Sequence, residues 1–147
     1  MNIAFGSDHA GFEKPEPYYK PELVKYLESK GHSVIDCGTD GPDSVDYPDY
    51  ASRVSSAILE GNAEAGILLC GTGIGMSITA NRHKGIRAAV CTTEEMARLS
   101  REHNHANVLC IGRRLLSLDA CKAIIDAWLA EPYSGVDRHA RRVAKMG

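Results

Sequence analysis

Gly66-Ile67-Leu68-Leu69-Cys70-Gly71-Thr72-Gly73-Ile74-Gly75 is the stretch that decides the fold of this chain. The branched, apolar run 65–69 is typical of a fully buried strand in a parallel sheet. Cys70 then lies at the carboxyl end of that strand, where open α/β sheets bind their ligands. The alternating glycines allow a tight turn whose N–H groups face an anion. The stretch therefore predicts a thiol beside an anion-binding turn, here called the glycine turn (71–75).

The glycine turn suits a small anion or an oxyanion better than a nucleotide. A helix at 76–82 would place its positive N-terminus near Cys70 and favour the thiolate. The dinucleotide fingerprint requires G-x-G-x-x-G and an acidic residue about 20 positions later, and the spacing here is different. No Gly-Lys-Ser/Thr follows, so the turn is not a P-loop. The alternative interpretation is an ordinary turn with a buried, inert cysteine.

Composition limits the classes of function. A chain of 147 residues is expected to form one domain, residues 1–147, that buries about 70% of its unfolded surface. Its 17 Lys and Arg against 19 Asp and Glu argue against a nucleic-acid or membrane-surface partner. Five cysteines without a C-x-x-C pair, and no targeting segment, predict a reduced, cytoplasmic setting. Its partners are expected to be small molecules or proteins.

Strand and helix patterns alternate along the chain. Strands are predicted at 2–6, 33–36, 65–69, 85–90 and 107–112, and helices at 23–30, 50–60, 76–82, 93–102, 118–130 and 136–145. This alternation predicts an α/β protein, a Rossmann-like three-layer α/β/α sandwich with a five-stranded parallel sheet. Carboxyl ends of parallel strands share one edge, so Asp8 and His9, which follow the first strand, are expected beside Cys70. Alternatively, Asp8 only caps a helix and His9 is a surface residue.

Two further groups of polar residues suit an anionic substrate. His103 and Asn104 close the predicted fourth helix, and a histidine is a ready general acid or base. His9, His103 and His105 lack a recognisable zinc-ligand spacing, so no metal is predicted. Arg138 and Arg142 share one helical face and could clamp a phosphate. A solvated basic helix end or a minor nucleic-acid patch is the alternative.

Together these residues suit proton transfer beside a carbonyl in a phosphorylated molecule, as in an aldose–ketose isomerase that acts through an enediolate. Five motifs in order, Gly6–Gly11, Asp46–Pro48, Cys70–Gly75, Ser100–Asn104 and Arg138–Arg142, resemble those of the ribose-5-phosphate isomerase B family. That family includes galactose- and allose-phosphate isomerases. The resemblance covers nearly the whole chain. It implies no metal or organic cofactor, and a homodimer, with a dimer of dimers also open, whose active sites use residues of both subunits.

The resemblance also implies a role for each site residue. Cys70 would move a proton between C2 and C1, His103 would open the furanose ring, and Thr72 would assist through its hydroxyl. The enediolate oxygens would be held by the amides of the glycine turn, those of Gly71, Thr72, Gly73, Ile74 and Gly75. Asp8, His9 and Tyr47 would line the sugar, with Asn104 beside His103. Arg114, Arg138 and Arg142 would bind the phosphate, and His9 is a candidate to join them.

Four further features concern the base, the segment 14–21, the substrate and the class of function. Some relatives use a glutamate where this chain has Met76, which leaves Cys70 as its base. Residues 14–21 look like an insertion that forms an extended rim loop, because three prolines lie there. The substrate is expected to be ribose 5-phosphate, with a six-carbon aldose 6-phosphate, of the allose or galactose type, as the alternative. A non-catalytic sugar-phosphate or nucleotide sensor and a cysteine hydrolase are rivals from other classes.

Overall fold

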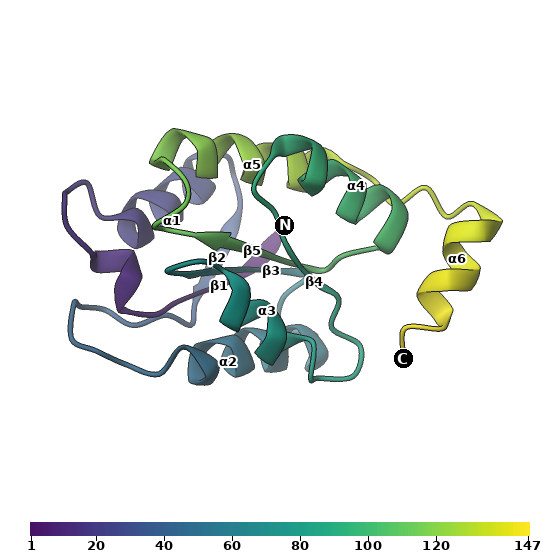
Figure 1. The fold of residues 1–147 in the computed structure, drawn as a ribbon, viewed down its shortest axis with the longest axis horizontal. Helices are drawn as coiled ribbons and strands as arrows, with labels where there is room; N and C mark the ends of the chain where they lie inside the picture. Colours follow the sequence, from purple (N-terminus) through teal and green to yellow (C-terminus); the bar gives the residue numbers. More distant parts are fainter.

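A computed structural model describes all 147 residues, which form a parallel sheet between two layers of helices (Figure 1). The sheet has five strands in the order β2-β1-β3-β5-β4, and every neighbouring pair is parallel. Its strands are β1 (Asn2–Ser7), β2 (Ser33–Asp36), β3 (Ala65–Cys70), β4 (Ala88–Val90) and β5 (Val108–Gly112). The predicted α/β/α sandwich with a five-stranded parallel sheet is therefore confirmed.

The helices begin and end near the predicted positions. They are a short 3-10 helix η1 (His9–Phe12), α1 (Tyr19–Ser29), α2 (Tyr47–Leu59), α3 (Ile74–Ala80), α4 (Glu94–Asn104), α5 (Leu118–Ala130) and α6 (Asp137–Ala144). Side-chain caps explain two of the starts: Thr93 accepts from the amide of Met96, and Ser117 accepts from the amide of Ala120. Such caps satisfy amides that have no partner inside the helix.

Three helices begin earlier than the sequence predicts. Helix α3 begins at Ile74 instead of residue 76, and α1 and α2 each have a proline in the first turn that was taken for a loop signal. Pro48 lies in the first turn of α2, where a helix needs no N–H from that residue. Pro21 likewise lies in the first turn of α1, which begins at Tyr19. The prediction that the whole segment 14–21 is an extended loop is therefore wrong for residues 19–21. The loop itself ends at Tyr18.

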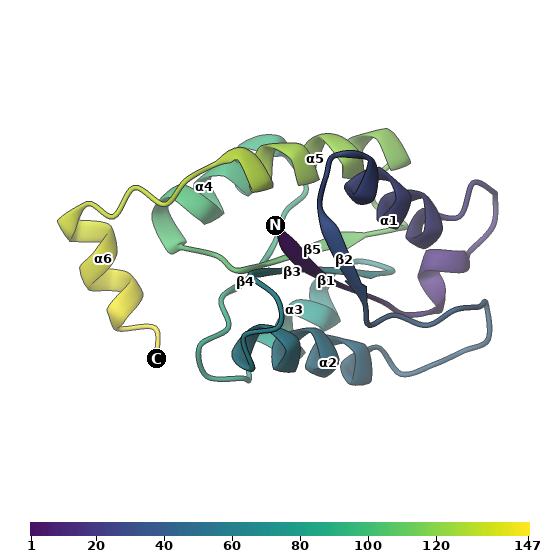
Figure 2. The same cartoon turned by 180° about the vertical axis from the view of Figure 1, so that it is seen from behind.

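Strand β3 is the centre of the sheet and is buried along its whole length. One face of the sheet packs against α1, α4 and α5, and the cluster there includes Phe5, Ile67 and Trp128. The opposite face packs against α2 and α3 (Figure 2), and its cluster includes Leu68 and Cys70. Burial on both faces explains why β3 is apolar without alternation. No helix of the chain is long and apolar enough to span a membrane.

Helix α6 stands apart from this sandwich (Figures 1 and 2). It follows an irregular segment after α5 and lies near the end of α4, to one side of the helical layers. Most of its side chains are exposed, and His139 is its buried residue. The helix therefore presents most of its basic surface to solvent in the single chain.

Candidate active site

A cavity of about 440 Å³ opens at the carboxyl edge of the sheet and contains the thiol of Cys70. The ends of β1 and β3 supply one wall each, the second residue after β5 supplies a basic side chain, and α2 contributes its first residue. The lining residues are Asp8, His9, Ala10, Tyr47, Cys70, Gly71, Thr72, Ile74, Gly75, Ile78 and Arg114. Nine of the predicted site residues thus meet in one place.

Cys70 is almost completely buried, with 5% of its surface exposed. The amide of Gly73 donates a hydrogen bond to Sγ at 3.1 Å, and the amide of Ile74 donates to Oγ1 of Thr72 at 3.2 Å. These two amides are already used within the turn. The amides of Gly71, Thr72 and Gly75 donate no hydrogen bond within the chain, so they are the ones available to an oxyanion. This set is smaller than the one that the sequence analysis expected.

Two glycines of the turn are required by its shape. Gly73 has a φ of 81°, in the left-handed region that side chains other than glycine rarely adopt. A Cβ on Gly75 would lie 2.4 Å from Cε1 of Tyr47, so the tyrosine ring packs directly on the glycine backbone. The turn and the ring of Tyr47 together form one wall of the cavity next to Cys70.

Asp8 and His9 are fixed by backbone groups. Oδ1 of Asp8 accepts from the amide of Ala10 at 2.9 Å, so Asp8 does cap η1 as the alternative interpretation expected, yet it also lines the cavity. Burial raises the pKa of Asp8, and the Ala10 amide, His9 and Arg114 oppose this increase. Nδ1 of His9 accepts from the amide of Val45 at 3.1 Å. An amide can only donate, so Nε2 is the nitrogen of His9 that carries the proton in the neutral ring.

The raised pKa of Asp8 predicts that an asparagine there stabilises the protein at neutral pH. Asparagine keeps an oxygen for the Ala10 amide and removes a buried charge. We expect Asp8→Asn to increase the free energy of unfolding by about 1 kcal/mol at neutral pH and to lower kcat/KM. The stability gain should vanish below about pH 4, where the unfolded carboxyl is protonated. Urea unfolding of the wild type and of Asp8→Asn between neutral pH and about pH 4 measures the difference in the free energy of unfolding. A variant that is less stable than the wild type at neutral pH would contradict the prediction.

The cationic member of the cavity wall is Arg114. Its amide donates to the carbonyl of Gly71 at 2.9 Å, and the amide of Arg113 donates to the carbonyl of Cys70 at 2.8 Å. The guanidinium lies over the glycine turn, since a Cβ on Gly71 would be 3.0 Å from its Nη1. An anionic group in this cavity would therefore meet Arg114 first.

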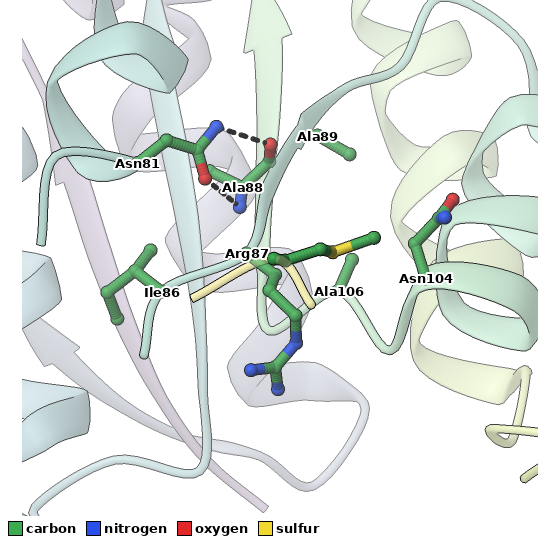
Figure 3. Close-up of a pocket in the computed structure, with 8 residues that line it drawn as sticks. Asn81, Ile86, Arg87, Ala88, Ala89, Asn104 and Ala106 are labelled. Atoms are coloured by element: carbon green, nitrogen blue, oxygen red, sulfur yellow. Dashed lines mark hydrogen bonds between the residues drawn. The ribbon is translucent and has the colours of Figure 1, made fainter. Parts of the chain in front are cut away.

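Of the five other predicted site residues, Gly73 contacts the cavity only through its hydrogen bond to Sγ of Cys70, and the remaining four lie elsewhere in the single chain. His103 and Asn104 form the end of α4, and Arg138 and Arg142 are exposed on α6. Asn104 lines a second cavity of about 390 Å³ beside the edge strand β4, shown in Figure 3. The side chain of Asn81 closes one wall of that cavity through hydrogen bonds with the backbone of Ala88. The two cavities have no lining residue in common.

His103 and the two arginines nevertheless lie near one another, through His139. The imidazole of His103 stacks on that of His139, with ring centroids 4.3 Å apart, which ties α6 to the end of α4. His139 lies between Arg138 and Arg142 in the sequence. Burial, together with His103, Arg138 and Arg142, lowers the pKa of His139. At neutral pH His139 is therefore uncharged, and the arginines on either side of it in the sequence carry positive charges.

The sequence analysis missed several residues of the cavity and its surroundings. Ile78 lies one helical turn after Ile74 on α3, so its spacing was a usable signal. Glu13 binds Arg114, and Val45 binds His9, but neither has a local signal because each partner is distant in sequence. No group of three or more His, Cys, Asp and Glu side chains has the arrangement of a metal site.

Comparison with known proteins identifies the family. Residues 3–146 match the model of the Ribose/Galactose Isomerase family. The chain is 49% identical to ribose-5-phosphate isomerase B of Escherichia coli, over 96% of this chain and 91% of that protein. A putative sugar phosphate isomerase of Rickettsia conorii is 43% identical, over 99% of this chain and 96% of that protein.

Solved structures agree with the sequence comparison. The structure of Clostridium thermocellum ribose-5-phosphate isomerase B matches with a TM-score of 0.94 and 49% identity, covering 100% of this chain and 95% of that one. A Thermotoga maritima ribose 5-phosphate isomerase matches with a TM-score of 0.92 and 50% identity, covering 99% of this chain and 96% of that one. With matches over nearly its full length in both sequence and structure, the chain belongs to the ribose/galactose isomerase family.

Proposed function

We propose that this protein interconverts ribose 5-phosphate and ribulose 5-phosphate through an enediolate, with Cys70 as the base. The observation that carries the proposal is the position of the thiol, which lies in the cavity beside three amides that have no acceptor within the chain. A base and an oxyanion site side by side are the two groups that proton transfer next to a carbonyl requires. The names of the family and of its Escherichia coli relative, a ribose/galactose isomerase and a ribose-5-phosphate isomerase B, agree with this chemistry.

The reaction assigns a task to each part of the cavity. The Cys70 thiolate takes the proton from C2 of the open-chain aldose, the C2–H electron pair forms the C1–C2 double bond, and the carbonyl oxygen O1 becomes negative. The free amides of the glycine turn would hold that oxygen. The thiol then gives the same proton to C1, the proton of the C2 hydroxyl passes to O1, and the result is a hydroxyl on C1, a ketose carbonyl at C2 and a thiolate at Cys70. The hydrogen bond from Gly73 to Sγ stabilises the thiolate before it takes the proton and after it has returned it.

The positions of the remaining residues support a site that is shared by two copies of the chain. His103, Asn104, Arg138 and Arg142 lie outside the Cys70 cavity of their own chain. Ile74 and Ile78, which line the cavity, are 52% and 59% exposed, so they can pack against a second subunit. We infer a homodimer in which the α4 and α6 residues of one protomer complete the cavity of its partner. His103 would open the sugar ring there, and the two arginines would bind the phosphate.

An assay with a panel of aldose phosphates tests the proposal. We expect the highest kcat/KM with ribose 5-phosphate, and lower values with allose 6-phosphate and galactose 6-phosphate. A higher value for a six-carbon sugar would assign the protein to that branch of the family chemistry. Binding without turnover would identify a sensor, and a trapped thioester on Cys70 would identify a hydrolase. Either of the last two results would overturn the isomerase proposal.

A further inference from the structure

The rim segment, residues 13–18, contacts two consecutive arginines that follow β5. Both carboxylate oxygens of Glu13 lie 3.2 Å from Nε of Arg114. Nη2 of Arg113 donates to the carbonyls of Glu13 and Pro15, at 3.3 and 3.4 Å. The rim segment is therefore attached to the polypeptide that forms the wall of the cavity.

Arg114 is the one lysine or arginine that lines the Cys70 cavity. Its guanidinium has five N–H donors in a planar fork. Glu13 uses the Nε donor, and Arg114 makes no other side-chain hydrogen bond within the chain. The four Nη donors stay free, and Nη1 lies above Gly71. The contact with Glu13 therefore fixes the plane of the guanidinium while it leaves the outer edge available to an anion.

The backbone of Glu13 is held independently of its carboxylate. The guanidinium of Arg113 lies 4.1 Å from the ring centroid of Tyr19, which is buried at the start of α1. From there it binds the carbonyl of Glu13. Since Arg113 and Arg114 are also tied through their amides to the carbonyls of Cys70 and Gly71, the rim segment and the glycine turn form one connected unit.

We propose that Glu13 is a positioning residue that orients Arg114 toward the phosphate of the substrate. This inference rests on the proposed function for the identity of the substrate. Without Glu13, the exposed Arg114 side chain would sample many rotamers, and binding would have to restrict them. Two carboxylates face Arg114, Glu13 and Asp8. Glu13 could therefore act instead as a negative charge that competes with the phosphate.

Two substitutions at position 13 distinguish orientation from competition. Glu13→Gln keeps an oxygen that accepts from Nε and removes the charge, whereas Glu13→Ala removes both. If Glu13 orients Arg114, alanine should raise KM for ribose 5-phosphate about three- to fivefold, with kcat within about twofold, and glutamine should restore the wild-type KM. Glu16→Ala is the matched control, because Glu16 is exposed in the same segment and its side chain makes no hydrogen bond.

Inorganic phosphate supplies a readout that does not need turnover. Its dissociation constant, measured by calorimetry, should rise in Glu13→Ala by the same factor as KM and stay unchanged in Glu13→Gln. The inference would be overturned if KM and the phosphate dissociation constant of Glu13→Ala were unchanged or lower than those of the wild type. It would also be overturned if Glu13→Ala and Glu13→Gln raised the two constants equally. If the wild-type protein binds phosphate but does not isomerise sugars, the proposed function fails while the phosphate measurements still decide the role of Glu13.

Discussion

Replacing Cys70 by alanine is expected to lower kcat for ribose 5-phosphate about 10²- to 10⁴-fold, the range that a positioned general base contributes. The reason is that no other side chain in the cavity combines a proton acceptor with a place at the start of the glycine turn. Asp8 is held by the Ala10 amide and His9 by the Val45 amide. The loss should appear in kcat, and KM should change less, because alanine leaves the glycine turn and Arg114 in place.

Two further variants make the Cys70 experiment decisive. Cys70→Ser fills nearly the same volume as the native side chain, but its hydroxyl is not ionised at neutral pH, so it should be almost as inactive as alanine. Cys37→Ala is the control, since Cys37 is a half-buried thiol that does not line the cavity. Initial rates with ribose 5-phosphate measure all three. Near wild-type activity in Cys70→Ala would refute the assignment of this residue as the base.

Replacing Arg138 and Arg142 together by alanine is expected to raise KM for ribose 5-phosphate at least about 100-fold. Each arginine can make charge-assisted hydrogen bonds to a phosphate, and losing two such contacts costs about 3 kcal/mol or more. Both side chains are exposed in the single chain, so the fold should be unaffected. Circular dichroism and the unfolding midpoint of the double variant, compared with Arg141→Ala on the same helix, check that point.

Mixing this double variant with Cys70→Ala tests whether the sites are shared. When the two proteins are unfolded and refolded together, half of the dimers carry one chain of each kind. In such a dimer one site combines the intact Cys70 of one protomer with the intact arginines of its partner. About a quarter of the wild-type activity should therefore return.

The control for this experiment mixes two variants of the same wall of the cavity. Cys70→Ala with Tyr47→Ala leaves every site damaged, because both residues line the cavity of one chain. No activity above that of Tyr47→Ala alone should appear. If the first mixture also stays inactive, each chain builds its own site, and the shared-site homodimer is wrong.

Local signals explain what could be predicted of the fold. The apolar run before Cys70 identified β3 because burial on both faces requires an uninterrupted hydrophobic strand. Ser117 directly precedes the helix predicted at 118–130, and its hydroxyl satisfies an amide at the start of α5. The same approach placed the starts of α1 and α2 too late, since proline is compatible with a first helical turn as well as with a loop.

The order of the strands explains why part of the site was predictable. Parallel strands end at one edge, so residues that directly follow β1 and β3 had to be neighbours, and Asp8, His9 and Cys70 are. Glu13 and Arg114 lie 101 positions apart along the chain. Only the pairing of β1 with β3 and of β3 with β5 brings such residues together.

The sequence by itself determined that a buried strand ends at Cys70 and is followed by the glycine turn. Hydrophobic pattern and the backbone freedom of glycine are local properties, so the sequence is sufficient to predict both. The tertiary structure decided which amides of that turn are free, since the Gly73 and Ile74 amides are used by the neighbouring Sγ and Oγ1 atoms. It also separated Cys70 from His103, Arg138 and Arg142 within one chain. That separation depends on where α4 and α6 pack. Contacts between residues that are distant in the sequence determine these positions, and no local sequence pattern encodes them.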